Sequence, residues 1–398
     1  MKVLYAIQAT GNGHVSRANE IIPLLQKKCD LDILLSGTQA DVGINYPVKF
    51  QCKGLSFVFG KKGGVDFYKT FKQLQSKRVL NEIKKLPVED YDLVINDFEP
   101  ISAWASKIKN VPCISMSHQY AVLHKNAPRP DKYDPFALMV LRYYAPCKSG
   151  IGFHFKKYGD NIFTPVIRNE IRTSKISNTG HYTVYLPAYD DKKIIDFFTN
   201  FKNIEWQIFS KHTTASYREK NCFIRPVNAQ SFTESFTSCE GIVCGAGFET
   251  PAEALHMGKK VLVIPMKSQY EQHCNAAAAA ELGVPVIKSL KKKHIHKVEN
   301  WLLNTQQINV DFKDETSKII DLVLSKSLLK VTSTELKEFH TVANTVKYNL
   351  ENILNFFTNR HTNANAESFN SKIKLFRANL RGVTDTKFFL FRLYKFFA

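Results

Sequence analysis

Hydrophobic and polar positions follow a regular pattern along the first half of the chain. Short runs rich in β-branched residues are separated by segments whose apolar positions have helical spacing. The predicted strands lie at residues 3–7, 31–36, 93–96 and 113–117, and the predicted helices at 16–28 and 102–109. Strands that alternate with helices indicate βαβ units and therefore a parallel sheet.

A second series of the same kind begins near His181. Its predicted strands lie at residues 182–186, 204–209, 241–244 and 260–265, and its predicted helices at 192–201, 231–239, 251–257 and 272–282. Open parallel sheets bind their ligands beyond the carboxyl ends of the strands. We therefore predict an α/β fold with two Rossmann-like domains that face each other across a cleft, with the active site in that cleft.

The alternation ends near Leu328, where a helical segment rich in asparagine and phenylalanine begins. This change predicts three parts: a first Rossmann-like domain at 1–165, a second at 166–327, and a short, mainly helical tail at 328–398.

The composition is that of a positively charged globular protein. Of the 398 residues, 44% are hydrophobic and 12% aromatic, which argues against wholesale disorder. Lysine and arginine outnumber acidic residues by 55 to 36. The net charge of +19 favours anionic partners such as phosphorylated ligands, nucleic acid or an anionic membrane surface. Most of these cations are nevertheless expected on the solvated surface.

The N-terminus and the cysteines predict a cellular compartment. The opening residues run into a glycine-rich loop after a few apolar positions, so we expect no signal peptide, and no apolar stretch reaches 18 residues. The eight cysteines have no Cys-x-x-Cys pair and no zinc-type spacing, so we expect reduced, mostly buried thiols. We predict a cytoplasmic protein and leave open a peripheral contact with the inner membrane surface.

The strongest local motif is the glycine loop Cys-Gly-Ala-Gly-Phe-Glu-Thr-Pro, which starts at Cys244 between a predicted strand and a predicted helix. Gly245 and Gly247 let the backbone approach a phosphate, and Thr250 is expected to cap a helix whose free N–H groups attract anions. A diphosphate would fit this loop, and Glu253 would then accept hydrogen bonds from ribose hydroxyls. The alternative is an ordinary tight turn followed by a surface glutamate.

A second polar cluster follows the next predicted strand, where Gln269-Tyr-Glu-Gln-His-Cys-Asn opens another helix. Glu271 and Gln272 carry the carboxylate and amide groups that bind sugar hydroxyls.

The spacing of both motifs, from Gly245 to Gly283, resembles the donor-binding signature of GT-B glycosyltransferases. These include relatives of the lipid-linked GlcNAc transferase of peptidoglycan synthesis (family 28) and the UDP-glycosyltransferases. The resemblance implies that the glycine loop contacts the diphosphate, Glu253 the ribose, and the second cluster the sugar, in the domain at 166–327. Phe248 departs from the small or polar residue of many relatives. The implied donor-site residues are Gly245, Ala246, Gly247, Thr250, Glu253, Glu271, Gln272 and Asn275.

The first loop, Ala9-Thr-Gly-Asn-Gly-His-Val-Ser-Arg17, follows the first predicted strand. Ser16 occupies the place of the third glycine of a dinucleotide fingerprint, and no acidic residue ends the second strand, so a nicotinamide or flavin enzyme is disfavoured. The loop also lacks a P-loop lysine. It resembles the first loop of the same glycosyltransferases, which implies that Gly11, Gly13 and Arg17 face the acceptor and the donor phosphates across the cleft.

An inverting transferase needs a base for the acceptor hydroxyl. The candidates are His14, Asp97 and His118, and His118 is also expected to line the cleft. Asp97 would act as the base or would orient a histidine. Arg17 would pair with the negative charge of a phosphate or would be only a surface residue of its helix. We expect neither a metal nor another cofactor.

The tail, roughly residues 332–398, resembles the C-terminal segment of DDE transposases from insertion sequences. Glu367 would correspond to the last of their three metal-binding acids. Such a site needs further carboxylates from an RNase H-like sheet, and nothing upstream resembles one. We therefore expect Glu367 to be catalytically idle in a fusion remnant, with at most weak nucleic-acid affinity in the tail.

The sequence thus favours transfer of a hexosyl-type sugar from a nucleotide sugar, first of all a UDP-sugar, to an unknown acceptor. A lipid-linked acceptor near residues 67–78 is left open. One alternative is a non-hydrolysing sugar-nucleotide epimerase, and an alternative of another class is a DNA-binding transposase remnant.

Overall fold

The computed structural model describes residues 1–37, 43–54, 59–60, 64–65, 76–131, 134–267 and 269–325. The chain divides into two compact units, Met1–Val331 and Thr332–Ala398. The second unit, which contains Glu367 and the transposase-like motif, lies outside the described residues.

The first half of the described chain forms a parallel sheet of seven strands in the order β3-β2-β1-β6-β7-β8-β9. Its strands are β1 (Lys2–Gln8), β2 (Asp30–Ser36), β3 (Phe50–Cys52), β6 (Leu93–Asp97), β7 (Cys113–Ser117), β8 (Ser149–Phe153) and β9 (Ile162–Phe163). Its helices are α1 (Asn12–Gln26), α3 (Ser76–Lys85), α4 (Pro100–Lys109), α5 (His118–Val122) and α6 (Pro135–Tyr144), and a separate hairpin pairs β4 (Phe59–Gly60) with β5 (Gly64–Val65).

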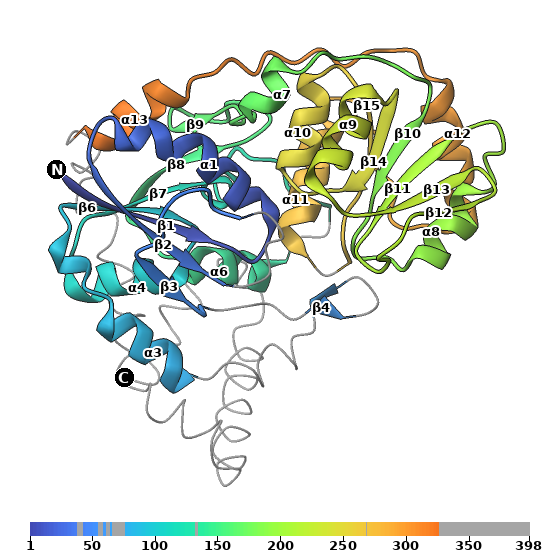
Figure 1. Ribbon diagram of the computed structural model, residues 1–398. Helices are drawn as coiled ribbons and strands as arrows, with labels where there is room; N and C mark the ends of the chain where they lie inside the picture. Colours follow the sequence, from blue (N-terminus) through green and yellow to red (C-terminus); the bar gives the residue numbers. More distant parts are fainter. Residues whose placement is uncertain are drawn as a thin grey trace, which may run out of the picture. The chain divides into compact units, whose positions relative to one another are not determined.

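Both faces of this sheet are covered by helices (Figure 1). Val3, Tyr5 and Ile7 of β1 pack into one core cluster with α1, whereas Leu4 and Ala6 pack into another with α3 and α4. Successive side chains of a strand point to opposite faces, so a strand buried on both sides reads as an uninterrupted hydrophobic run. This is the reason that β1 could be identified from its sequence.

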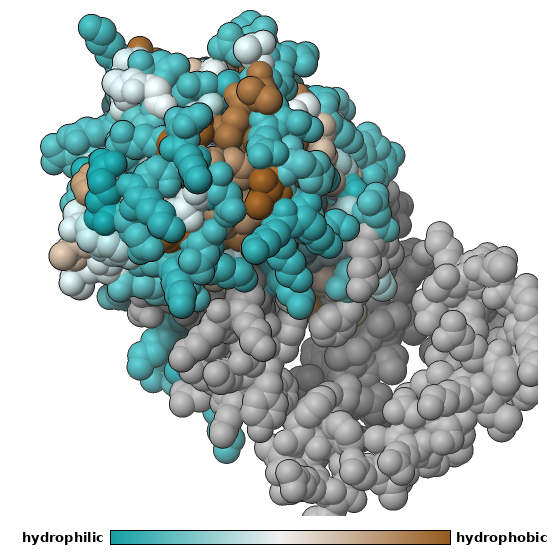
Figure 2. Space-filling view, turned by 90° about the vertical axis from the view of Figure 1, so that its right-hand side faces the viewer, coloured by the Kyte–Doolittle hydropathy of each residue, from teal (hydrophilic) through white to brown (hydrophobic). Residues whose placement is uncertain are grey.

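The second half forms a sheet with the order β12-β13-β11-β10-β14-β15, in which β12 alone of the described strands runs antiparallel. Its strands are β10 (Tyr182–Tyr185), β11 (Trp206–Ser210), β12 (Tyr217–Glu219), β13 (Cys222–Pro226), β14 (Gly241–Gly245) and β15 (Lys260–Ile264). The helices that follow β9 are α7 (Asn169–Thr173), α8 (Asp191–Phe198), α9 (Ala229–Ser238), α10 (Glu249–His256), α11 (Tyr270–Ala280), α12 (Ile295–Leu303) and α13 (Thr316–Leu324). The outer face on the side of β12, β13 and α12 is mainly hydrophilic, with one narrow hydrophobic strip (Figure 2).

Two parallel-type sheets with helices between their strands confirm the predicted α/β class. Strand β8 was missed because Gly150 and Gly152 weaken its hydrophobic pattern. Both positions are glycine because α5 packs directly on them: a Cβ at Gly152 would lie 2.6 Å from the backbone nitrogen of Ala121.

The last described helix returns to the first sheet. Helix α13 packs beside α1 (Figure 1), and Lys28 Nζ donates a hydrogen bond to Asp321 Oδ1 at 2.5 Å. The predicted boundaries placed all of residues 166–327 with the second sheet, so this helix is a difference from that prediction. An amphipathic helix shows an apolar stripe in its sequence but does not show which surface covers that stripe.

The remaining general features concern membranes, metals and thiols. Among the described residues, no helix has both the length and the apolar character of a membrane span. The described part of the chain also contains no group of three or more His, Cys, Asp or Glu side chains placed to hold a metal ion. All eight cysteines are free; four are buried and four are half-buried, so the expectation of mostly buried thiols holds for half of them.

Candidate active site

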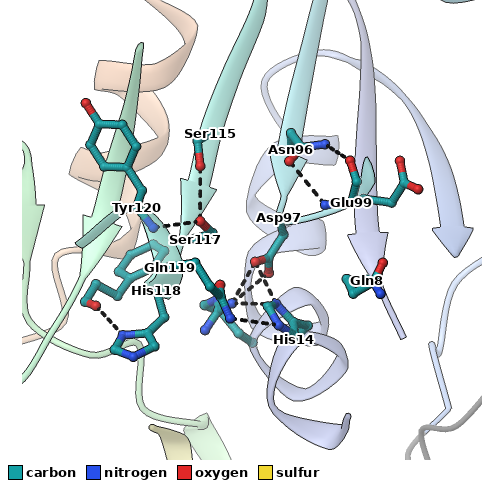
Figure 3. Close-up of polar contacts among 12 residues, drawn as sticks. Gln8, His14, Asn96, Asp97, Glu99, Ser115, Ser117, His118, Gln119 and Tyr120 are labelled. Atoms are coloured by element: carbon teal, nitrogen blue, oxygen red, sulfur yellow. Dashed lines mark hydrogen bonds and ion pairs between the residues drawn. The ribbon is translucent and has the colours of Figure 1, made fainter. Parts of the chain in front are cut away.

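His14 and Asp97 meet at the carboxyl edge of the first sheet (Figure 3). Strands β1 and β6 are neighbours with Ile7 opposite Asp97, so the loop after β1 and the end of β6 lie side by side. His14 stands in the first turn of α1, and its Nδ1 lies 2.8 Å from Asp97 Oδ1. The carboxylate is fully buried, whereas the His14 side chain is 15% exposed. The imidazole is therefore the accessible partner and Asp97 the residue that orients it.

The hydrogen bonds of His14 define its tautomer. The amide Nε2 of Gln119 lies 3.3 Å from His14 Nε2 and also donates to Glu271 Oε2 at 3.1 Å. A carboxylate only accepts hydrogen bonds, so this amide group is a donor and His14 Nε2 accepts from it. His14 Nδ1 lies 2.8 Å from Asp97 Oδ1 and 3.1 Å from Arg17 Nη2, and with the nearer carboxylate as its partner the neutral ring carries its proton on Nδ1 and donates it to Asp97. His14 Nε2 is left as a basic atom at the site.

Arg17 binds the same carboxylate from the other side. Its Nη2 donates to both oxygens of Asp97, at 2.7 and 2.8 Å, and its side chain is only 1% exposed. Burial alone would raise the pKa of Asp97, but the charges and hydrogen bonds of Arg17 and His14 hold that pKa below its ordinary value. Asp97 is thus an anion in the folded protein. The alternative that Arg17 merely decorates its helix is wrong.

Arg17 also connects the two halves of the site, because its Nη1 donates to Glu249 Oε1. Glu249 is the first residue of α10 and lies against the first loop, where a Cβ at Gly13 would be 3.3 Å from Glu249 Cδ. Burial raises the pKa of Glu249, and the nearby charges of Arg17, His118 and His14 oppose that rise. Sequence reasoning missed this residue, although it lies within the glycine-loop motif.

The glycine loop itself follows β14 and leads into α10. The residue before the helix is Phe248, and no side chain caps the helix, so the expectation that Thr250 is the N-cap is wrong. The helix begins earlier than expected because Glu249 is already helical, and Thr250 becomes its second residue. A hypothetical Cβ at Gly247 or at Gly11 would meet no atom within 4 Å. Uncapped N–H groups beside open space can accept an anion.

Helix α11 brings the second polar cluster to this loop. Asn275 Nδ2 donates to the carbonyl of Ala246 at 3.1 Å. Gln272 Oε1 accepts from the backbone of Met266 at 2.9 Å and lies 3.6 Å from a hypothetical Cβ at Gly245. The structure therefore places Gln272 and Asn275 of the second motif beside Gly245 and Ala246 of the glycine loop.

Glu253 has a partner that sequence reasoning missed. Arg168 donates to both of its carboxylate oxygens, from Nε at 2.6 Å and from Nη2 at 2.8 Å, and the Glu253 side chain is 5% exposed. The alternative of a surface glutamate is therefore wrong. Ribose recognition by Glu253 stays a prediction, and in the structure both of its oxygens are engaged by Arg168.

His118 is buried between the two halves rather than open to the cleft. Its Nδ1 lies 2.8 Å from the carbonyl of Phe153, and its Nε2 lies 2.7 Å from Asn275 Oδ1. Its ring stacks on Phe248 with a centroid distance of 3.9 Å and an angle of 8° between the planes. Figure 3 shows it turned away from the group formed by His14, Asp97 and Gln119.

The segment at 67–78 lies mostly outside the described residues, which resume with α3. An acceptor site there stays a prediction.

Comparisons with known proteins fit this arrangement. A family model described as "Glycosyl transferase family 1" matches residues 1–306, and a model described as "Transposase" matches residues 270–393. The two matches overlap at residues 270–306, and the structure places those residues in α11, α12 and their connections. No curated protein matches the chain.

Three solved structures are similar to this chain at low identity. The glycotransferase of kitacinnamycin is 12% identical with a TM-score of 0.50, over 81% of this chain and 93% of that one. MurG from Acinetobacter baumannii is 15% identical with a TM-score of 0.45, over 81% and 94%. Phytolacca americana UGT2, complexed with UDP-2-fluoro-glucose and pterostilbene, is 13% identical with a TM-score of 0.48, over 86% and 99%. The match to the glycotransferase of kitacinnamycin, together with the two parallel sheets, confirms the predicted GT-B fold.

Proposed function

The chain belongs to glycosyl transferase family 1, and on that premise we propose that it moves a hexosyl-type sugar from a nucleoside diphosphate, first of all UDP, to an acceptor hydroxyl without a metal. The observation that carries the proposal is the His14–Asp97 pair, whose basic Nε2 is joined through Gln119 to Glu271 at the predicted sugar site. A base on one side and an anion loop on the other are the two parts that such a reaction requires.

In the proposed reaction, His14 Nε2 removes the proton of the acceptor hydroxyl while the hydroxyl oxygen attacks the anomeric carbon. The bond from that carbon to the diphosphate oxygen breaks, and the nucleoside diphosphate leaves with the electron pair. Asp97 stabilises the imidazolium that forms, because it accepts the hydrogen bond from His14 Nδ1. Attack from the side opposite the leaving group inverts the anomeric centre.

The departing diphosphate would be stabilised by the glycine loop and by the start of α10. The first-turn N–H groups of this helix have no side-chain cap, and the positive end of the helix dipole points to the loop. Glu271 and Gln272 would contact the donor sugar, since α11 begins beside that loop, and Asn275 would hold the loop through the carbonyl of Ala246.

The test uses the purified full chain with UDP-sugars and, separately, with GDP- and dTDP-sugars. We expect slow release of the nucleoside diphosphate by hydrolysis when no acceptor is present, and faster release when extracts of membrane lipids supply acceptors. The His14→Gln variant should bind the nucleotide as the wild type does but release no product. Excess EDTA should leave the rate unchanged.

Two results would contradict this function. Isomerisation of the sugar nucleotide in the absence of any acceptor, followed by NMR, would identify an epimerase instead. Full activity of His14→Gln would remove the proposed base.

A further inference from the structure

We propose that His118 is a buried imidazolium that supplies a fixed positive charge to the glycine loop and thereby binds the diphosphate of the sugar nucleotide. The inference rests on the proposed function, because it names a binding residue for that donor. Sequence reasoning placed His118 as a candidate base and as a residue that lines the cleft.

The first observation is that both ring nitrogens face acceptors. The carbonyl oxygen of Phe153 can only accept, so His118 Nδ1 must donate across their 2.8 Å contact. Asn275 Oδ1 is also an acceptor, and it lies 2.7 Å from His118 Nε2. A neutral imidazole has one N–H group, so two donated hydrogen bonds require the doubly protonated ring.

The orientation of the Asn275 amide group is fixed by its other contact. Its Nδ2 donates to the carbonyl of Ala246 at 3.1 Å. A flipped amide would place Oδ1 against that carbonyl oxygen, so two acceptors would repel each other and the hydrogen bond would be lost. Ala246 therefore holds Oδ1 towards His118.

The surroundings of the ring favour a cation. The flat face of Phe248 lies against it at a centroid distance of 3.9 Å, and an aromatic face attracts positive charge. Glu249, the next residue in the chain, interacts electrostatically with His118. His154 packs edge-on at 5.1 Å and accepts on Nδ1 from the backbone of Phe155 at 2.9 Å. Burial, with the charges of His118 and Arg129, holds the pKa of His154 well below its ordinary value, so that neighbour is neutral.

The charge balance of the site gives the imidazolium its role. Arg17 donates to both Asp97 and Glu249, one cation to two carboxylates. With both carboxylates ionised, a protonated His118 makes this group of four side chains neutral, whereas a neutral His118 would leave a net negative charge beside the loop. A diphosphate would be repelled in the second case. Both Ala246 and Phe248 of the loop are tied to this ring, directly or through Asn275.

The experiment measures the affinity of the full chain for UDP, dTDP and GDP, and for the three matching nucleosides, between about pH 5.5 and 9. We expect diphosphate affinity to fall as the pH rises, because His118 loses its charge, while nucleoside affinity stays constant. His118→Gln should bind the diphosphate about tenfold or more weakly at low pH, lack this pH dependence and retain nucleoside affinity. Retained nucleoside binding also shows that the variant is folded.

Three variants separate His118 from its neighbours. Glu249→Gln removes a counter-ion of His118, so the pH-dependent loss of diphosphate affinity should move to lower pH. If that pH dependence is absent from Glu249→Gln but present in His118→Gln, Glu249 is the titrating group and the inference is wrong. Asn275→Leu removes the acceptor for His118 Nε2, so the loss of diphosphate affinity should again move to lower pH. This variant provides a test if His118→Gln does not fold. His256→Gln, at the far end of α10, is the control that should match the wild type.

Nitrogen NMR gives a direct reading. The histidine signal that vanishes in His118→Gln should show N–H on both ring nitrogens in the wild type. Equal diphosphate affinity in wild type and His118→Gln at every pH would overturn the inference and leave the proposed function intact. Failure of all three diphosphates to bind the wild type would instead contradict the proposed donor.

Discussion

Arg17 donates to both carboxylate oxygens of Asp97, at 2.7 and 2.8 Å, in a site where neither side chain is more than 1% exposed. The same guanidinium reaches Glu249 in the second half of the protein. The candidate base and the predicted diphosphate loop are therefore linked by one side chain. A substitution in one half is expected to affect the site residues of the other half.

Loss of Arg17 should destabilise the fold as well as the site. Arg17→Gln leaves Asp97 buried without its cation, and removal of one partner of a buried pair costs about 3–5 kcal/mol. Glu249→Gln is the matched comparison: it leaves the Arg17–Asp97 pair in place and keeps an oxygen acceptor for Arg17, so we expect a loss on the order of 1 kcal/mol. Denaturant unfolding of both variants measures this. Equal losses would contradict the ranking.

Loss of His14 should act on the chemical step. His14→Gln removes the base, and general base catalysis contributes about 10²–10⁴-fold to the rate. We expect kcat to fall by such a factor while the affinity for the nucleotide stays constant, because His14 is not predicted to bind the nucleotide. Steady-state kinetics and equilibrium binding check the two parts separately. A rise in KM with unchanged kcat would assign His14 to substrate binding instead.

Ionisation of Asp97 should make the stability of the folded protein depend on pH in the acid range. Its pKa is lowered in the folded protein, so its ionisation stabilises the fold above the ordinary aspartate pKa of about 3.9. This contribution is lost as the pH falls below that value and through the lower folded pKa. Melting temperatures from pH 2 to 7 should show a steeper acid loss for the wild type than for Asp97→Asn. Parallel curves would mean that Asp97 does not carry the effect.

Glu253 and Arg168 can be separated by paired variants. If Glu253 binds ribose, Glu253→Ala should weaken uridine binding about tenfold, whereas Arg168→Ala should free the carboxylate and preserve binding. Calorimetry with uridine distinguishes these outcomes. Equal affinity of the wild type and Glu253→Ala would show that the ion pair with Arg168 is the only role of Glu253.

The tail should be dispensable for sugar transfer. A chain that ends at Val331 keeps the whole first unit, so we expect unchanged donor turnover, and Glu367→Gln in the full chain should also match the wild type. Salt-dependent DNA binding should require the tail. Loss of turnover in a folded truncation, or DNA binding by residues 1–331 alone, would contradict the separation of the two parts.

The sequence by itself determined the alternation of strands and helices, the two glycine-rich loops and the types of side chain at the carboxyl ends of the strands. Hydrophobic periodicity and glycine spacing are local properties, so β7 was predicted with its observed bounds and α10 to within two residues at its start. The N-cap of α10 was nevertheless predicted wrongly: we expected Thr250 at this position, and the structure has Phe248. Local patterns did not reveal β8, because its glycines are set by the packing of α5.

Only the tertiary structure decided how the site residues act together. The sequence left open whether Asp97 acts as the base or orients a histidine, and the pairing of β1 with β6 placed it in contact with His14. The roles of Arg17, Glu249 and His118 depend on contacts between the two halves, and those contacts come from residues more than 100 positions apart in the chain. Charge pairing and hydrogen-bond direction depend on distance in space, and no spacing along a sequence records that distance.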